Sequence, residues 1–321
     1  MVRVRSTFLA GLGFIALGLA ACTDVQQPIL PMTKPVARPD IPAAPQKPAQ
    51  VARPTSEASA ALRSYLNQVQ SAQLSQGLLR RDGGGEDTPF TDAMLARNFE
   101  KIAFYNEYDS DFSGRGGASP LRRWTAPVRM EVIFGDAVPP SQRKSDSETI
   151  SAYAARLGRA TGHPVSMGGT PNFIVIVAGE DDRRDTLAAA IARMPSISQS
   201  SIAPLINLPK DTYCVVAAYS GGSGANTYTA ALAVIRAENP SLLRLSCIHE
   251  ELAQGMGLAN DSPHARPSIF NDDDEFALLT RQDELMLKML YDPRLSPGMH
   301  AEEARPTVQR IARELTSAGP V

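Results

Sequence analysis

Apolar residues recur at helical spacing in two segments near the start of the folded part. The i, i+3, i+4 and i+7 positions of the first segment are Leu62, Tyr65, Leu66 and Val69. This spacing predicts an amphipathic helix over about residues 56–79. A second helix is expected to begin at Thr91, which is a good N-cap residue, and to bury Leu95, Phe99 and Ile102.

Strand patterns and helix patterns alternate from residue 128 onward. Alternating or continuous apolar runs predict strands over residues 128–134, 173–177, 213–219 and 228–235. Helical spacing predicts helices over residues 147–159, 186–194 and 305–315. A helix pair, then a mixed sheet with interleaved helices, and then helices to the end together predict an α+β fold.

The first residues have the pattern of a bacterial export signal. Arg3 and Arg5 precede an uncharged apolar run over residues 8–19, which is too short to span a bilayer and is typical of a signal peptide. The run ends in Leu-Ala-Ala-Cys, and this ending resembles the lipobox of bacterial lipoproteins. The resemblance implies that Cys22 becomes the lipidated first residue of the mature chain. The alternative is an ordinary secretory signal that is cleaved near Ala20 or Ala21.

Prolines recur through residues 28–54, where their spacing prevents helix formation and disfavours a sheet. We therefore expect a signal peptide over 1–21, a Pro-rich extended tether over 22–55 and a folded domain over 56–321. The lipid on Cys22 would anchor the protein in the membrane, with the folded domain facing the periplasm. Thr23, where enteric sorting rules would place Asp for inner-membrane retention, favours the outer membrane.

Composition excludes several classes of function. Lys and Arg number 32 against 34 Asp and Glu, so bulk positive charge does not predict a nucleic-acid partner. Four His and three Cys are too few for a multi-zinc or iron–sulfur protein. In an oxidising envelope Cys214 and Cys247 are expected to form a disulfide. The alternative is a catalytic thiol, although no His stands in a recognisable cysteine-protease context.

One segment, residues 247–261, carries candidate chemistry. It resembles the zincin metallopeptidase helix, His-Glu-x-x-His, and above all the metzincin form that continues with x-x-Gly-x-x-His. In one register His249 and Glu250 match His-Glu, but Ala253 takes the second ligand position. In the other register every spacing matches, and oxygen donors or amides replace the three imidazoles. That register gives Glu250, Gln254 and Asn260 as ligands, Glu251 as catalytic base and Gly257 as turn glycine.

In the second register the segment resembles a bacterial family of unknown function, domain of unknown function 2927, whose members are often lipoproteins. Further resemblances are Ser-Ile-Phe-Asn-Asp at residues 268–272, the stretch over 279–293 and the Arg-Asp-Gly turn at residues 81–83. Together they extend over about residues 78–299. The resemblance implies a zincin-like mixed sheet with an active-site-type helix, preceded by two helices, and it implies no settled activity.

Zinc prefers nitrogen and sulfur ligands, so Gln254 and Asn260 make zinc doubtful and favour a harder divalent metal or no metal. His249 together with His264 or His300 would restore imidazoles to a zinc site, although neither spacing matches a known motif. We expect an envelope lipoprotein with a non-catalytic binding or scaffolding role, whose partner is an envelope protein or peptide. The alternative is a metal-dependent peptidase or other hydrolase with Glu251 as general base.

Overall fold

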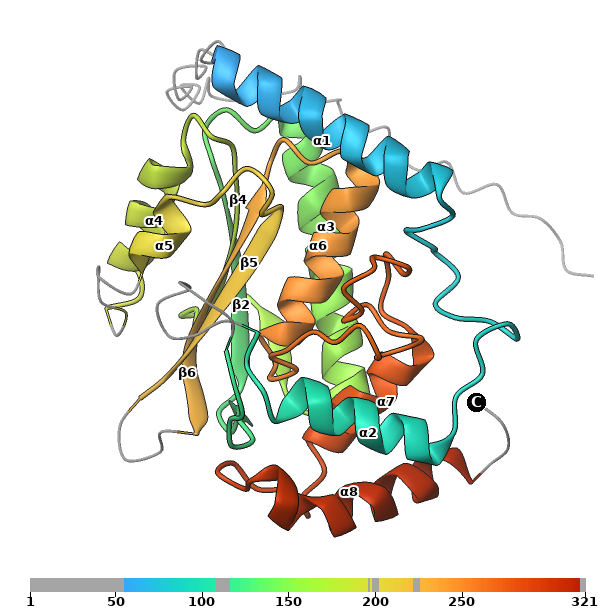
Figure 1. Ribbon diagram of the computed structural model, residues 1–321. Coiled ribbons are helices and arrows are strands. Elements are labelled where there is room, and N and C mark those ends of the chain that lie inside the picture. Colours follow the sequence, from blue (N-terminus) through green and yellow to red (C-terminus); the bar gives the residue numbers. More distant parts are fainter. Residues whose placement is uncertain (1–54, 108–115, 196, 198–201, 222–225, 318–321) are drawn as a thin grey trace, which may run out of the picture. The chain divides into compact units, whose positions relative to one another are not determined.

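The computed structural model describes residues 55–107, 116–195, 197, 202–221 and 226–317. The predicted signal peptide, Cys22 and nearly all of the predicted tether lie outside the described residues. The described part is a mixed α/β fold with a largely parallel sheet and eight helices (Figure 1). No helix in these ranges combines the length and the apolar character needed to cross a membrane.

The sheet has six strands, of which five form the path β1-β6-β4-β2-β3 with parallel neighbours throughout. The strands are β1 (Arg123–Trp124), β2 (Val128–Phe134), β3 (Val165–Met167), β4 (Phe173–Ala178), β5 (Cys214–Ser220) and β6 (Thr227–Arg236). Strand β5 is the exception, because it runs antiparallel to β6, with Cys214 opposite Ile235. The predicted mixed sheet is therefore present.

Strand β4 is buried on both faces, and its alternate residues belong to two hydrophobic cores. Phe173, Val175 and Val177 pack into the larger core, which includes α3 (Pro140–Thr161) and α6 (Ser241–Gln254). Ile174, Ile176 and Ala178 pack into the smaller core with α4 (Arg183–Ala192) and α5 (Ala203–Ile206). Figure 1 shows α4 and α5 on one face of the sheet and α3 and α6 on the other.

The remaining helices surround the α6 face. The two helices predicted before the sheet are present as α1 (Glu57–Ser75) and α2 (Asp92–Ala103). The chain closes with α7 (Arg281–Leu290) and α8 (Ala301–Thr316), which pack against α2. Helix α1 is attached by Leu62 and Leu66, which pack on Leu243 of α6. It is also attached by a 2.6 Å hydrogen bond from the Ser59 hydroxyl to the buried Glu238 carboxylate.

Differences from the expected elements have simple causes. Helix α3 begins seven residues before the predicted start at 147, because Pro140 occupies its first turn and the residues that follow are polar. Strands β1 and β3 and helix α5 were not predicted, since two to four residues are too few to show a period. Helix α1 ends at Ser75 and is shorter than the expected 56–79.

Candidate functional site

Helix α6 follows β6 directly and lies beside the antiparallel strand β5 (Figure 1). The predicted disulfide between Cys214 of β5 and Cys247 of α6 is present, with the two Cα atoms 5.8 Å apart. It joins the helix to the strand across the larger core, in which Leu252 and Ala253 are fully buried. The side chains of α6 that follow Cys247 are therefore held against β5.

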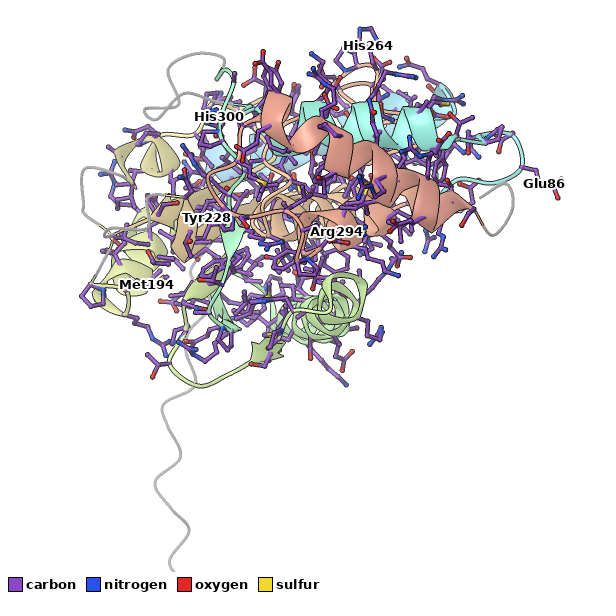
Figure 2. All side chains as sticks on the ribbon, turned by 90° about the horizontal axis from the view of Figure 1, so that it is seen from below. Glu86, Met194, Tyr228, His264, Arg294 and His300 are labelled. Carbon is purple, nitrogen blue, oxygen red and sulfur yellow. A yellow bond between two sulfur atoms is a disulfide. The ribbon has the colours of Figure 1, made fainter. Side chains whose placement is uncertain are left out.

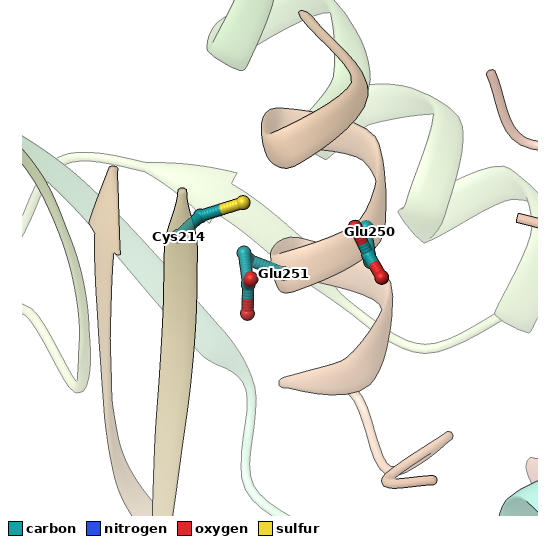
Figure 3. Close-up of side chains that lie close together, drawn as sticks. All are labelled: Cys214, Glu250 and Glu251. Carbon is teal, nitrogen blue, oxygen red and sulfur yellow. The ribbon is translucent and has the colours of Figure 1, made fainter. Parts of the chain in front are cut away.

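Glu251 lies one helical turn after Cys247 and points toward β5 (Figure 3). Its side chain is only 4% exposed. The backbone N–H of Val216 donates a hydrogen bond to the Glu251 carboxylate. The second oxygen, Oε2, is buried and accepts no hydrogen bond. A buried carboxylate oxygen that accepts no hydrogen bond costs free energy of folding, because its lost contacts with water are not replaced.

Glu250 brings a second carboxylate to the same place. One oxygen of Glu250, one oxygen of Glu251 and the sulfur of Cys214 all lie within 4.8 Å of one another (Figure 3). The sulfur of Cys214 belongs to the disulfide, so it offers no thiolate to a metal ion. The two glutamates are therefore the ionisable part of this group.

Gln254 connects the helix to two further carboxylates. Its side-chain amide donates to Asp261 Oδ1 at 3.0 Å and to Glu107 Oε2 at 3.5 Å. The backbone N–H of Glu107 donates to the carbonyl of Ala259 at 3.0 Å, which fixes Glu107 beside the chain that follows α6. We call Glu107, Glu250, Glu251 and Asp261 the acidic cluster.

Electrostatics in the acidic cluster are unfavourable to ionisation. Burial is the largest cause that raises the pKa of Glu250, Glu251 and Asp261 well above the usual range. Repulsion adds to this effect, because the charges acting on these three groups belong to other carboxylates, Glu107 among them. The cluster therefore gathers negative charge that a proton or a cation must compensate.

A glycine allows the chain to turn back toward α6 after the helix ends. Gly257 has φ of +123°, and a Cβ atom there would lie 2.4 Å from the carbonyl oxygen of Arg122. The sequence predicted a turn at this glycine. The turn brings Asp261 back to Gln254, one residue beyond the Asn260 that the motif spacing selected.

His249 lies in the core, where its ring makes a hydrogen bond and a stacking contact. Its Nδ1 atom accepts a hydrogen bond from the backbone N–H of Leu279 at 3.0 Å, and its ring stacks on Tyr153 with centroids 4.1 Å apart. The Tyr153 hydroxyl in turn donates to the carbonyl of His249. Burial lowers the pKa of His249 to about 3, so the ring is neutral. These contacts are those of a structural histidine.

Asn260 also has a structural contact, since its side-chain amide donates to the carbonyl of Lys101 at 2.9 Å. Of the residues predicted as ligands, Glu250 belongs to the acidic cluster, as does the predicted base Glu251, and the Gln254 amide donates to two carboxylates of the cluster. Sequence reasoning missed Glu107 and Asp261 as contributors. Asp261 adjoins the motif and was open to recognition as a candidate, whereas nothing in the sequence near Glu107 connects it to α6.

The residues present do not fit the zinc of a zincin. His264 and His300 are exposed and far apart in Figure 2, and His163 contacts the carbonyl of Ala126. Within the described part of the chain, His/Cys/Asp/Glu ligand atoms converge in groups of three only at Cys214, Glu250 and Glu251. A site made of carboxylates without an imidazole or a thiolate does not suit zinc.

One family model matches the chain, over residues 92–310, and its description is "Protein of unknown function (DUF2927)". No curated protein and no solved structure matches the chain significantly. The matched range includes α6 and the whole acidic cluster, and it excludes α1. Because the match covers more than half of the sequence, the chain belongs to the DUF2927 family of proteins of unknown function.

Proposed function

We propose that this protein is a lipid-anchored component of the bacterial cell envelope whose folded domain is a zincin-like module that binds a partner without catalysis. The lipobox-like ending at Cys22 and the Pro-rich segment after it support the anchor and the tether. The Cys214–Cys247 disulfide is consistent with an oxidising compartment. The partner we expect is another envelope protein or a peptide.

One observation carries the non-catalytic part of this proposal. The helix that matches the zincin spacing presents carboxylates and one amide to the acidic cluster, and its histidine is bonded to Leu279 on another side. A zincin helix must present two imidazoles to the metal and a Glu to the metal-bound water. Glu251, at 4% exposure and bonded to Val216, has the surroundings of a structural group.

The catalytic part is tested by metal analysis and hydrolysis together. The full-length protein, purified in detergent, is expected to hold less than stoichiometric zinc and to leave a mixed peptide substrate uncleaved. A Glu251→Gln variant is expected to behave as the parent in both assays. Stoichiometric zinc, with hydrolysis that Glu251→Gln abolishes, would establish the alternative peptidase and end the non-catalytic proposal.

The anchor is tested separately. Substituting Cys22→Ser removes the only position at which the lipobox-like sequence allows lipidation, so the protein is expected to leave the membrane fraction. A matched Cys214→Ser variant keeps Cys22 and is expected to remain with the membrane. If Cys22→Ser protein stays quantitatively in the membrane fraction, the lipid anchor is wrong.

A further inference from the structure

Helices α3 and α7 pack against each other, and a pocket of about 500 Å³ opens between them (Figure 1). This volume lies within the range of pockets that hold ligands in other proteins. Arg156 and Arg159 line the pocket from α3, and Arg281, Glu284 and Lys288 line it from α7. Four cations and one carboxylate therefore share this basic pocket, in a chain whose overall formal charge is −2.

Helical spacing explains why these side chains meet. Arg281, Glu284 and Lys288 occupy positions i, i+3 and i+7 of α7, so they share one face of that helix. Arg156 and Arg159 are three residues apart on α3 and share a face in the same way. The basic pocket is therefore the place where the basic faces of two packed helices come together.

Glu284 compensates only part of the positive charge in the basic pocket. It accepts a 2.8 Å hydrogen bond from Arg156 Nε, and its other oxygen lies 4.0 Å from a guanidinium nitrogen of Arg281. Arg159 and Lys288 are exposed and make no ion pair within the described part of the chain. Two cations, and a third that is only loosely paired, are thus available to an anionic ligand.

Helix dipoles explain two of these cations and leave the third unexplained. Arg159 and Lys288 lie in the last turns of α3 and α7, where the helix dipole stabilises a positive charge. Arg281 is the first residue of α7, where the same dipole disfavours a cation. A cation at this position is expected if the positive charge of the pocket serves a ligand.

We propose that the basic pocket binds an acidic peptide segment of a partner protein, whose carboxylates pair with Arg159, Arg281 and Lys288. Arg281 and Lys288 lie about 10.5 Å apart along the axis of α7. Acidic side chains three residues apart in an extended peptide are separated by a similar distance, about 9–10 Å, whereas one phosphate group is too small to reach both cations. Leu285 also lines the pocket and offers an apolar contact to the residues between the two acidic side chains.

An anionic membrane surface is the other class of partner that a group of cations attracts. The cations of the basic pocket surround a concave space, whereas a flat bilayer contacts side chains that protrude. Tyr65, Leu74 and Met167, the exposed large apolar residues of the described part of the chain, do not line the pocket. It therefore lacks the apolar side chains with which peripheral proteins enter the interface of a bilayer.

This inference rests on the proposed function in one respect, since it takes the partner to be a protein or peptide and names the chemistry of the segment that binds. It does not require the lipid anchor or the absence of catalysis.

The test measures the fluorescence anisotropy of a labelled peptide that carries Asp at every third position among Gly, Ser and Leu. The full-length protein in detergent micelles is expected to bind this peptide saturably at low ionic strength. The same peptide with Asn in place of Asp is expected to bind about tenfold more weakly or not at all. Added sodium chloride should weaken the binding of the Asp peptide, because the pairs are accessible to solvent.

Paired substitutions locate the binding site. Arg159→Gln combined with Lys288→Gln removes the two unpaired cations and is expected to raise the Kd of the Asp peptide about tenfold. The matched control combines Arg63→Gln on α1 with Arg310→Gln on α8, which removes two exposed cations outside the pocket and should leave the Kd unchanged. Both proteins should unfold at the temperature of the parent, because all four side chains are exposed.

Glu284→Gln is expected to produce the opposite change. It removes the carboxylate that competes with the ligand for Arg156 and Arg281, while a 3.0 Å hydrogen bond to the carbonyl of Leu279 still holds Arg156 in place. The Asp peptide should therefore bind about threefold more tightly. Damage to the fold does not produce a gain of affinity, so this variant separates the charge of the pocket from its structural role.

Four outcomes would overturn the assignment of an acidic peptide to this pocket. These are no saturable binding of the Asp peptide, equal binding of the Asn peptide, equal losses in the two paired variants, and weaker binding by Glu284→Gln. Phosphatidylglycerol vesicles supply the membrane arm, with Cys22→Ser protein so that no lipid anchor contributes. If that protein binds the vesicles but not the peptide, and loses the vesicles with Arg159→Gln and Lys288→Gln, the pocket belongs to a membrane contact. Each of these results leaves the proposed function standing, because that proposal fails only on zinc-dependent hydrolysis or on membrane retention without Cys22.

Discussion

Cys247 and Glu251 lie one helical turn apart on α6, and both are bonded to the same edge strand. Cys247 forms the disulfide with Cys214, and Glu251 accepts a hydrogen bond from Val216, two residues further along β5. Four residues of helix span about 6.0 Å along the helix axis, and two residues of strand span about 6.6 Å. The spacing between the two contacts is therefore nearly the same on α6 as on β5. The disulfide thereby sets the position of Glu251 along the strand.

Removal of the disulfide is expected to lower the free energy of unfolding substantially. The bond joins residues 33 positions apart, and the chain-entropy model assigns about 4 kcal/mol to a loop of this length. Urea unfolding of the Cys22→Ser protein should show this loss when a reductant is added. A protein that also carries Cys214→Ser and Cys247→Ser should be insensitive to the reductant. Two reactive thiols in denatured, unreduced Cys22→Ser protein would contradict the bond itself.

Gly257 should tolerate no side chain. A Cβ atom there would lie 2.4 Å from the carbonyl oxygen of Arg122, in a backbone conformation that L residues rarely adopt. We expect Gly257→Ala to destabilise the protein by about 3 kcal/mol or more in chemical unfolding. Gly162 is the matched control, because it also has positive φ but has open space around it. Gly162→Ala should cost about 1–2 kcal/mol, and equal losses for the two variants would show that the contact with Arg122 is unimportant.

Much of the fold could be predicted because its elements are long and strongly patterned. The continuous apolar run at β4 predicted a central strand, and all six of its residues are buried. The helix spacing around Leu62 and Leu66 predicted α1, and both residues are buried against α6. Pairing of Cys214 with Cys247 was predicted from the oxidising compartment that the expected export signal would imply, and the disulfide is present.

The candidate site was less predictable because its geometry depends on contacts between distant residues. Motif spacing places Glu250, Glu251 and Gln254 on a single helix, where one oxygen of Glu250 lies near one of Glu251 and the Gln254 amide donates to Asp261. Spacing cannot show that His249 turns to Leu279, thirty residues away, or that Glu107 arrives from the segment after α2. The resemblance to a zincin helix selects the candidate positions on α6, and tertiary contacts determine what each side chain does there.

The burial of His249 should make the protein sensitive to acid. Its pKa is about 3 in the folded protein against 6.5 when exposed, so the unfolded chain takes up a proton that the folded one refuses. This contribution to stability is complete above pH 6.5 and is lost as the pH falls toward 3. Between pH 7.5 and 4.5 the loss amounts to about 2–3 kcal/mol.

A His249→Gln variant isolates this term, because its amide is neutral at every pH while the acidic cluster titrates in both proteins. The unfolding free energy of the parent should fall by about 2–3 kcal/mol more than that of the variant between these two pH values. Parallel pH profiles for the two proteins would mean that His249 is accessible to protons, contrary to its bond from Leu279.

Helix α1 lies outside the range that the family model matches, yet it should be part of the cooperative unit. Leu66 is fully buried against Leu243 of α6, whereas Leu74 on the same helix is 46% exposed. Leu66→Ala is expected to cost about 2–4 kcal/mol in urea unfolding, because it opens a cavity between α1 and α6. Leu74→Ala should cost less than about 0.5 kcal/mol. Equal and small effects would show that α1 detaches before the domain unfolds, and limited proteolysis of both variants would reveal early cleavage between α1 and α2 in that case.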